Sequence, residues 1–305
     1  MVNSLDSIAD AAGRFAILAI DQRDSLRSML AKAGLPNADA DLSAFKVDVI
    51  DALSPLATGV LTDAEYGAGP AREQGALAVS AGLLIAADRS PQPKWNGEPR
   101  PAYDPERGPQ YVTAAGGVAL KFLVRWRPDR PARDGEPDLA AEALDAVRRV
   151  VEDCRAHGMP AVIEPLIAKL PGEESLDAAQ TRRLVVRSAR LLAELGPDLL
   201  KLEWPGDADG CKELTEVCGN VPWALLSAGV PYERFVDRVL TAMDAGASGY
   251  IAGRAFWGEA VALTGEARQE FLRTTAADRM RDLNAAIQGR GRSWREVAAG
   301  REVTG

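Results

Sequence analysis

Two lysines lie inside short apolar runs of the chain, where lysine is uncommon. Lys201 stands between two leucines in DLLKLEWPGD (198–207), and Lys121 stands between a leucine and a phenylalanine in VALKFLVRW (118–126). Burying an ammonium group costs free energy unless the group is paired or gives up its proton. Each lysine is therefore expected either to form a buried ion pair or to take part in a reaction.

The reactive alternative is nucleophilic attack by an amine. A lysine beside a second cation in apolar surroundings loses its proton more easily, and the neutral amine can form a Schiff base with a carbonyl carbon. The protonated imine then accepts electrons, so a C–C bond next to a hydroxyl-bearing carbon can break once a base takes the hydroxyl proton. This is aldolase chemistry without a metal, and Lys121, Lys201 and the intervening Glu164 form a suitable set.

The structural alternative is an ion pair of these lysines with Glu164 or Asp21. Such a pair is weak evidence for stability, because the desolvation of two charges can exceed their attraction.

Metal-binding and histidine-dependent sites have little support in the sequence. His157 is the only histidine, which excludes a Ser-His-Asp triad and a histidine-rich metal site. Cys154, Cys211 and Cys218 lack metal-type spacing, and an odd number of cysteines suits a reducing cytosol. We therefore expect a cytoplasmic protein with no metal ligands and no cofactor.

Composition narrows the range of partners. The 305 residues carry a formal net charge of −8, which disfavours binding to nucleic acid phosphates. No run of about 18 apolar residues is present, so no membrane span is expected. Residues 1–15 lack the pattern of a signal peptide. A small-molecule partner is expected, and a homo-oligomer would be common for a soluble enzyme.

Short apolar runs, often ending in a polar or charged residue, alternate with segments of helical periodicity. The runs are 15–23, 59–67, 82–90, 118–126, 160–167, 198–205, 221–229 and 248–255. The helical segments include 42–53, 139–154, 176–195, 232–245 and a closing segment, 271–287. Eight buried parallel strands with intervening helices predict a single (β/α)8 TIM barrel domain over residues 1–305. An open doubly wound sheet is disfavoured, because the first strand is not followed by a glycine-rich turn.

One connection stands out. Residues 90–110, after the third strand, read SPQPKWNGEPRPAYDPERGPQ and are too rich in proline and glycine for a helix. A loop of this length in a compact domain is usually functional or mobile, so we expect it to overhang the barrel mouth.

The carboxyl ends of barrel strands form the face where such enzymes do chemistry. The polar and charged residues at these ends are Asp21, Arg23, Asp63, Glu65, Asp88, Lys121, Arg125, Glu164, Lys201, Glu203, Ser227 and Arg254. Because side chains alternate along a strand, Lys121 shares a face with Arg125, and Lys201 shares a face with Glu203.

The last two strands predict an anion site. SAGV (227–230) leads through Pro231 into a helix, and AGRA (252–255) ends the eighth strand. Glycines allow backbone N–H groups to approach a ligand closely, and TIM barrels often bind phosphate after strands seven and eight. Arg254 would add a fork of donors to the same oxygens.

Segments from 15 to 257 resemble, in order, one family. They are LAIDQRDSLRSML, AFKVDVIDALSP, LTDAEYG, LLIAADRS, GGVALKFLVRWRPD, VIEPL, DLLKLEWP, PWALLSAGV and GASGYIAGRAFW. Together they are similar to the metal-independent class I aldolases acting on tagatose 1,6-bisphosphate and on 6-deoxy-6-sulfofructose 1-phosphate.

The resemblance implies a (β/α)8 fold and reversible cleavage of a ketohexose 1-phosphate to dihydroxyacetone phosphate and a three-carbon aldehyde. It implies that Lys201 forms the Schiff base, that Lys121 and Glu164 assist proton transfer, and that Asp21 contacts substrate hydroxyls. The implied substrate-binding residues are Gln22, Arg23, Asp63, Asp88, Ser227, Ala228, Gly229, Gly253 and Arg254.

The substrate is open between two branches of that family. TDAEYG resembles the tagatose-bisphosphate branch, whereas AADRS and ALKFLVRWRPD resemble the sulfofructose-phosphate branch. We predict 6-deoxy-6-sulfofructose 1-phosphate, with tagatose or fructose 1,6-bisphosphate as the alternative. A bisphosphate would need more positive charge at C6, for which Arg23 and Arg89 are the candidates. A phosphosugar isomerase or epimerase and a non-catalytic phosphosugar sensor are the alternatives from other classes.

Overall fold

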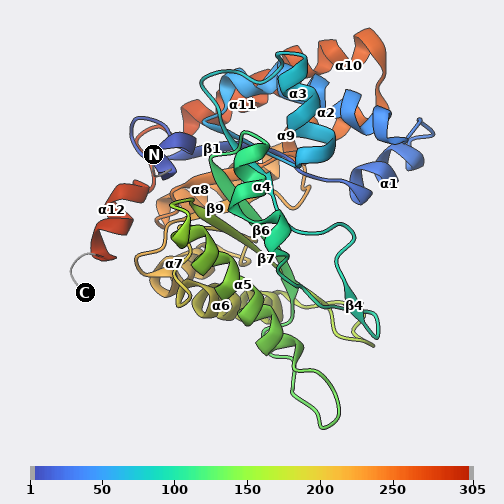
Figure 1. Cartoon of the computed structure of the whole chain (residues 1–305). Coiled ribbons are helices and arrows are strands. Elements are labelled where there is room, and N and C mark those ends of the chain that lie inside the picture. Colours follow the sequence, from blue (N-terminus) through green and yellow to red (C-terminus); the bar gives the residue numbers. More distant parts are fainter. Residues whose placement is uncertain (1–3, 302–305) are drawn as a thin grey trace.

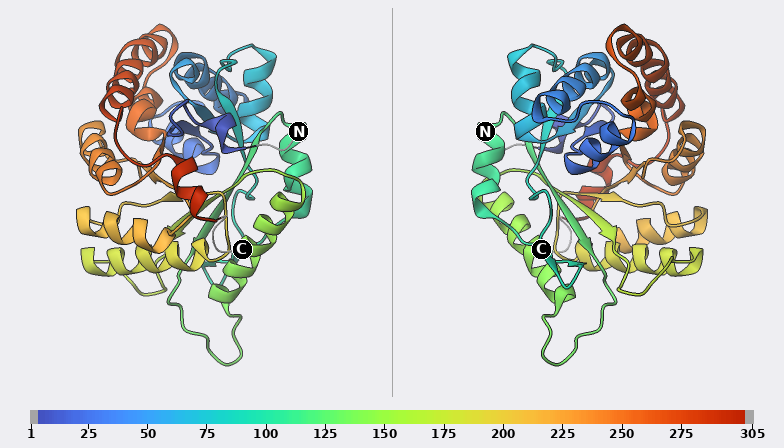
Figure 2. Two further views of the ribbon diagram at one scale, coloured as in Figure 1. Left: turned by 90° about the vertical axis from the view of Figure 1, so that its left-hand side faces the viewer. Right: turned by 90° about the vertical axis from the view of Figure 1, so that its right-hand side faces the viewer.

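Eight parallel strands close into a barrel (Figures 1 and 2). The computed structural model describes residues 4–301. The barrel strands are β1 (Phe15–Ile20), β2 (Gly59–Thr62), β3 (Gly82–Ala86), β6 (Ala119–Trp126), β7 (Ala161–Ile167), β8 (Leu199–Leu202), β9 (Trp223–Leu226) and β10 (Gly249–Ala252). Their order around the barrel is β1-β10-β9-β8-β7-β6-β3-β2. The predicted (β/α)8 fold is therefore confirmed, with every predicted run contributing its strand.

Helices surround the barrel on its outside (Figure 2). They are α1 (Asp24–Lys32), α2 (Asp39–Leu53), α3 (Gly69–Glu73), α4 (Pro109–Ala114), α5 (Leu139–Ala156), α6 (Ala178–Ala193), α7 (Ala208–Cys218), α8 (Tyr232–Asp244), α9 (Arg254–Trp257), α10 (Gly265–Phe271), α11 (Ala277–Ala286) and α12 (Trp294–Ala298). The predicted segments 42–53, 139–154, 176–195 and 232–245 fall in α2, α5, α6 and α8. The closing segment 271–287 begins at the last residue of α10, passes through a π-helical turn, η6 (Leu272–Ala276), and continues as α11. Within residues 4–301 the structure has no helix with the length and apolar character of a membrane span.

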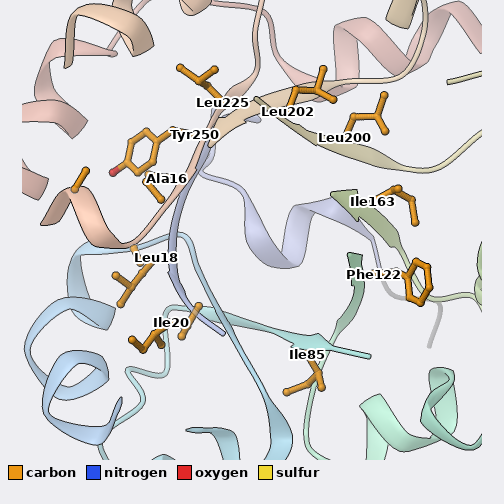
Figure 3. Close-up of a cluster of buried hydrophobic side chains, with 14 of the residues drawn as sticks. Ala16, Leu18, Ile20, Ile85, Phe122, Ile163, Leu200, Leu202, Leu225 and Tyr250 are labelled. Carbon is orange, nitrogen blue, oxygen red and sulfur yellow. The ribbon is translucent and has the colours of Figure 1, made fainter. Parts of the chain in front are cut away.

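Alternating side chains divide the apolar residues of the strands into two layers. One set points outward and packs against the helices; it includes Leu18, Ile85, Phe122, Ile163 and Leu200 (Figure 3). The other set fills the barrel interior and comprises Phe15, Ile17, Ala19, Leu61, Leu84, Ala86, Ala119, Val162, Leu199, Ala224 and Ile251. Two residues further along several strands, the inward positions become charged, which places those charges directly above the inner apolar layer.

The opposite end of the barrel is covered. The turn η1 (Leu5–Ile8) places Leu5 and Ile8 against the inner apolar layer at the amino ends of the strands. A side chain at Gly82, at the start of β3, would collide with the backbone of Ser7. A ligand therefore reaches the inward charges from the carboxyl ends of the strands.

The long loop after β3 is more ordered than its composition suggests. It forms a small hairpin of β4 (Lys94–Trp95) and β5 (Glu98–Pro99), followed by the turn η4 (Pro105–Arg107). Asn96 and Gly97 have φ of 46° and 85°, as a two-residue hairpin turn requires. Residues 90–110 therefore contain a short hairpin, for which the Asn-Gly pair is a signal in the sequence, and α4 begins at Pro109.

Two contacts fix this loop to β6. Gln92 donates a hydrogen bond from Nε2 to the carbonyl oxygen of Leu123 at 2.7 Å. Arg130, in the loop between β6 and α5, donates to both carboxylate oxygens of Glu98 at 2.8 and 3.1 Å and lies over the ring of Trp95. The hairpin consequently lies beside the outer ends of β6 and β7 (Figure 1).

Candidate active site

Glu164 lies between the two lysines that the sequence singled out. Its Oε2 is 2.8 Å from Nζ of Lys121, and its Oε1 is 2.9 Å from Nζ of Lys201. The two lysines and the glutamate point inward from β6, β8 and β7, and only 1%, 4% and 8% of their respective surfaces are exposed. The structure therefore brings the predicted set together in one charged layer.

Lys121 has further carboxylate partners. Its Nζ lies 2.7 Å from Oδ2 of Asp21, which follows β1, and 3.3 Å from Oδ1 of Asp88, which follows β3. The same oxygen of Asp88 accepts the backbone N–H of Leu123 at 3.1 Å. Lys121 thus contacts three carboxylates, whereas Glu164 is the only carboxylate paired with Lys201 among the described residues.

These contacts fix the ionisation of the layer. Burial alone would raise the pKa values of Asp21 and Glu164, but the charges of the two lysines outweigh it and lower both. Burial would lower the pKa of Lys121, but its three carboxylate neighbours outweigh that effect and raise it. Lys121 is therefore held as a cation, and Asp21 and Glu164 are held as anions by the positive charges beside them.

A second buried ion pair extends this layer toward α2 and was not predicted. Lys46, on α2, forms an ion pair with Asp63 and donates a hydrogen bond to the carbonyl oxygen of Ile20 at 2.9 Å. The other carboxylate oxygen of Asp63 accepts the N–H of Tyr66 at 2.7 Å. Neither side chain of the pair has any exposed surface, and burial lowers the pKa of Lys46 despite the opposing charge of Asp63.

The expectation that Asp63 binds substrate has no geometric support, because both of its oxygens are engaged inside the protein. Its position instead joins α2 to the carboxyl ends of β1 and β2. The sequence analysis missed Lys46 because the strand that a helical side chain contacts depends on how the helix packs. The local sequence does not determine that packing.

Arg23 is also paired with a carboxylate inside the protein. Its guanidinium donates to the backbone oxygen of Asp88 at 2.8 Å and to Oδ2 of the same residue at 2.6 Å. Burial would lower the pKa of Arg23, but the nearby carboxylates, Asp88 first, outweigh it and raise it. The neighbouring Gln22 differs, because its Oε1 is buried without a hydrogen-bond partner in the part of the chain that the structure describes.

The predicted anion residues lie together after β9 and β10. Ala228 and Gly229 have φ of 50° and 75° and form a tight turn closed by a hydrogen bond from Val230 N to Ser227 O at 3.1 Å. A non-glycine residue with positive φ is uncommon and is often found at functional sites. A Cβ on Gly229 would lie 3.0 Å from Cζ of Arg254, so this glycine makes room for the guanidinium.

Arg254 itself is exposed at the start of α9. Across residues 4–301 it forms no hydrogen bond or ion pair, so its donors are available to a ligand. Gly253 precedes it, and a Cβ there would collide with the carbonyl oxygen of Ala19.

Glu203 is a second residue that the prediction left without a role. It follows β8, two positions after Lys201 on the same face, and its Oε2 accepts the N–H of Ile167 at 2.8 Å. Burial raises the pKa of Glu203 to about 7, and the charge of Glu164 adds to this. The sequence predicts this position, because alternation along Lys201-Leu202-Glu203 places Glu203 on the same face as Lys201 and closer to the barrel mouth.

Metal ligands do not gather in the described part of the chain. No group of three or more His, Cys, Asp or Glu side chains within 4–301 has the arrangement of a metal site. His157 lies at the end of α5 against Asp153, and the three cysteines are buried.

Comparison with known proteins gives aldolases, both for the family model and for the bacterial relatives. Residues 15–259 match the family model described as DeoC/LacD family aldolase. The tagatose 1,6-diphosphate aldolase of Listeria monocytogenes serotype 4a is 29% identical over 325 aligned positions, covering 96% of this chain and 93% of that protein. Tagatose 1,6-diphosphate aldolase 2 of Streptococcus mutans is 28% identical, with 96% of each chain covered.

Solved structures support the same fold. An archaeal fructose 1,6-bisphosphate aldolase superposes with a TM-score of 0.62 at 19% identity, covering 92% of this chain and 96% of that one. A Schiff base-forming fructose-1,6-bisphosphate aldolase superposes with a TM-score of 0.59 at 20% identity, and the superposition covers 88% of this chain and 95% of that one. At this identity the likeness concerns the barrel fold alone.

Separating Lys46 from Asp63 is expected to destabilise the fold. The variants Lys46→Met and Asp63→Asn each leave one charge buried without its partner, which costs about 3–5 kcal/mol of the free energy of unfolding. The double variant should lose less than the sum of the two, as chemical denaturation would measure. The exposed pair of Arg148 and Asp145, 3.0 Å apart, is the control, and its double-mutant cycle should show little coupling. Additive losses at Lys46 and Asp63 would contradict the assigned contact.

Glu203→Gln is expected to change how stability depends on pH. Between the ordinary glutamate pKa of about 4.3 and about 7, the folded carboxyl keeps a proton that the unfolded chain has lost. The free energy of unfolding of the wild-type protein, relative to the variant, should therefore fall as pH rises through this window and stay level above it. Urea denaturation at a series of pH values measures this difference. A difference that is constant with pH would show that Glu203 is ionised in the folded protein.

Proposed function

Because the chain belongs to the DeoC/LacD aldolase family, we propose that it cleaves a ketohexose 1-phosphate through a Schiff base on Lys201. The products are dihydroxyacetone phosphate and a three-carbon aldehyde. The observation that carries the proposal is the sharing of one carboxylate, Glu164, by Lys201 and the cationic Lys121. We also propose that residues 1–305 act as one (β/α)8 catalytic domain.

The choice of Lys201 over Lys121 rests on their partners. An amine must be neutral to attack a carbonyl carbon. Lys121 contacts three carboxylates, and these raise its pKa, so it stays protonated. Lys201 shares one carboxylate, and that carboxylate also neutralises Lys121. Lys201 is therefore the better nucleophile of the two, and Lys121 provides the fixed positive charge beside it.

Proton transfer is assigned to the groups around this pair. When C3–C4 breaks, its electron pair moves into the protonated imine to give an enamine, while the C4 hydroxyl gives its proton to a base. Glu164 is within hydrogen-bonding distance of Nζ of Lys201, so it can move protons during imine formation and hydrolysis. Asp21 lies across Lys121 from Glu164 and is the group proposed to contact the substrate hydroxyls.

The phosphate on C1 is proposed to bind after β9 and β10. The turn of Ser227, Ala228 and Gly229 presents backbone groups beside the guanidinium of Arg254, which has no partner within residues 4–301. An arginine fork and backbone N–H groups are a common combination for phosphate oxygens.

The proposed substrate is 6-deoxy-6-sulfofructose 1-phosphate, which would give 3-sulfolactaldehyde as the aldehyde. A sulfonate carries one negative charge, whereas a phosphate carries about −1.5 to −2 near neutral pH. Arg23 and Arg89, the cations expected to serve a second phosphate, are paired with Asp88 and Asp104. This pairing supports the less charged group. The second candidate is tagatose 1,6-bisphosphate, which the names of the bacterial relatives favour.

Trapping the imine tests the mechanism. Incubation with dihydroxyacetone phosphate and borohydride is expected to add a reduced triose adduct to the peptide 198–207, as mass spectrometry would detect. Lys201→Arg keeps the positive charge but cannot form the imine, so both the adduct and cleavage should be lost while the fold persists. Lys94→Arg, at an exposed lysine of the β4–β5 hairpin, is the matched control and should trap normally. An adduct confined to Lys121 would overturn the assignment.

Competing substrates test the assignment of the C6 group. We expect kcat/KM for 6-deoxy-6-sulfofructose 1-phosphate to exceed that for tagatose 1,6-bisphosphate, because Arg23 and Arg89 are already paired with carboxylates. The ratio of the two kcat/KM values measures this discrimination. A preference for the bisphosphate beyond about tenfold, or about 1.4 kcal/mol, would reverse the choice of substrate and leave the Schiff-base mechanism in place.

A further inference from the structure

Nearly all arginines in the loops at the barrel mouth are already paired with a carboxylate. This holds for every arginine in the described loops after β1, β3 and β6, namely Arg23, Arg89, Arg100, Arg107, Arg127, Arg130 and Arg133. Two arginines at the ends of barrel strands differ. Arg125 and Arg254 form no hydrogen bond or ion pair with any residue of the described range.

Arg125 faces the interior side of the barrel. On β6, Leu120, Phe122, Val124 and Trp126 pack outward against the helices, so the alternate positions Lys121, Leu123 and Arg125 face inward. Arg125 lies four residues beyond Lys121, about 13 Å further along the strand toward the mouth. Its side chain is exposed there, so it can meet a ligand without displacing another group.

The two unpaired arginines lie on opposite sides of the barrel. In the strand order β10-β9-β8-β7-β6, four steps separate β10, which Arg254 follows, from β6, which carries Arg125. Four steps are half of the eight-stranded circle. Lys201 is on β8, two steps from each. A chain molecule attached at Lys201 with one anionic end on Arg254 therefore directs its other end toward Arg125.

Glu203 adds a second contact on the same side. The strand pairing places Arg125 beside Leu166 of β7, and Oε2 of Glu203 accepts the N–H of the next residue of β7, Ile167, at 2.8 Å. A pKa of about 7 leaves part of the Glu203 population protonated near neutral pH, and this form can donate a hydrogen bond to an oxyanion. Arg125, with Glu203 beside it, therefore offers hydrogen-bond donors to an oxyanion at the outer ends of β6 and β8.

From this arrangement we infer that Arg125 is the specificity-determining residue for the anionic group at C6 of the substrate, in place of Arg23 and Arg89. The inference rests on the proposed function, since it takes Lys201 and Arg254 as the other two anchors. Beyond the proposed function, it assigns Arg125 the role of distinguishing a ketose with an anionic group at each end from a ketose with a single phosphate.

Binding of a non-reactive ligand tests this independently of catalysis. Hexitol 1,6-bisphosphate and hexitol 1-phosphate have no carbonyl group, so they cannot form an imine, and calorimetry gives their Kd values directly. The wild-type protein should prefer the bisphosphate by about tenfold or more. Arg125→Gln should abolish this preference and leave the Kd of hexitol 1-phosphate within about threefold of the wild-type value. Arg89→Gln, at an arginine paired with Asp104, is the matched control and should retain the preference.

Catalysis provides the second readout. Arg125→Gln should lower kcat/KM for 6-deoxy-6-sulfofructose 1-phosphate by about tenfold or more and leave fructose 1-phosphate cleavage nearly unchanged. Equal losses for both substrates, an unchanged Kd for the bisphosphate in Arg125→Gln, or a lost preference in Arg89→Gln would each overturn the inference. Failure of imine trapping alongside the expected Kd changes would overturn the proposed reaction and leave Arg125 as the anion contact.

Discussion

The structure depends on keeping a layer of buried charges neutral inside an apolar barrel. Four cations, Lys46, Lys121, Lys201 and Arg23, face four carboxylates, Asp21, Asp63, Asp88 and Glu164, and all eight side chains are almost entirely removed from solvent. Each is in contact with a partner of opposite sign. A charge without a partner at this depth would cost several kcal/mol, so the identity of each residue constrains its neighbours.

This neutrality bears on the proposed chemistry. A protonated imine on Lys201 carries the same charge as the ammonium group it replaces, so the layer stays balanced when the substrate is attached. Because three carboxylates fix Lys121 as a cation, the proposed mechanism assigns proton movement to Lys201 and Glu164. On this proposal, the fixed network around Lys121 confines changes of charge to the place where the carbonyl carbon would bind, as preorganised electrostatic catalysis requires.

Much of this layer could be predicted from the sequence because it lies on strands. Period-two alternation and the polar ends of apolar runs place Lys121, Glu164 and Lys201 on inward faces of adjacent strands, and the structure agrees. Pairings between elements could not be read in this way. Lys46 reaches Asp63 from a helix, and Arg23 turns toward Asp88, because of how α2 and the β1 loop pack in three dimensions. The β4–β5 hairpin was recoverable from its Asn-Gly turn.

The two ends of the site are built in different ways, and this difference affects how specificity can change. The end near Arg254 depends on backbone geometry, since Ala228 and Gly229 hold positive φ angles and Gly253 lies against Ala19. Substitutions there would disturb the turn itself. The end near Arg125 depends on side chains at the outer tips of β6 and β8, above a charged layer that they do not help to neutralise. On the proposed assignment, a change at Arg125 can therefore alter which group is recognised at C6 without altering the residues that surround Lys201. Recognition of the shared phosphate would then be coupled to the fold, whereas recognition of the variable end would be separable from it.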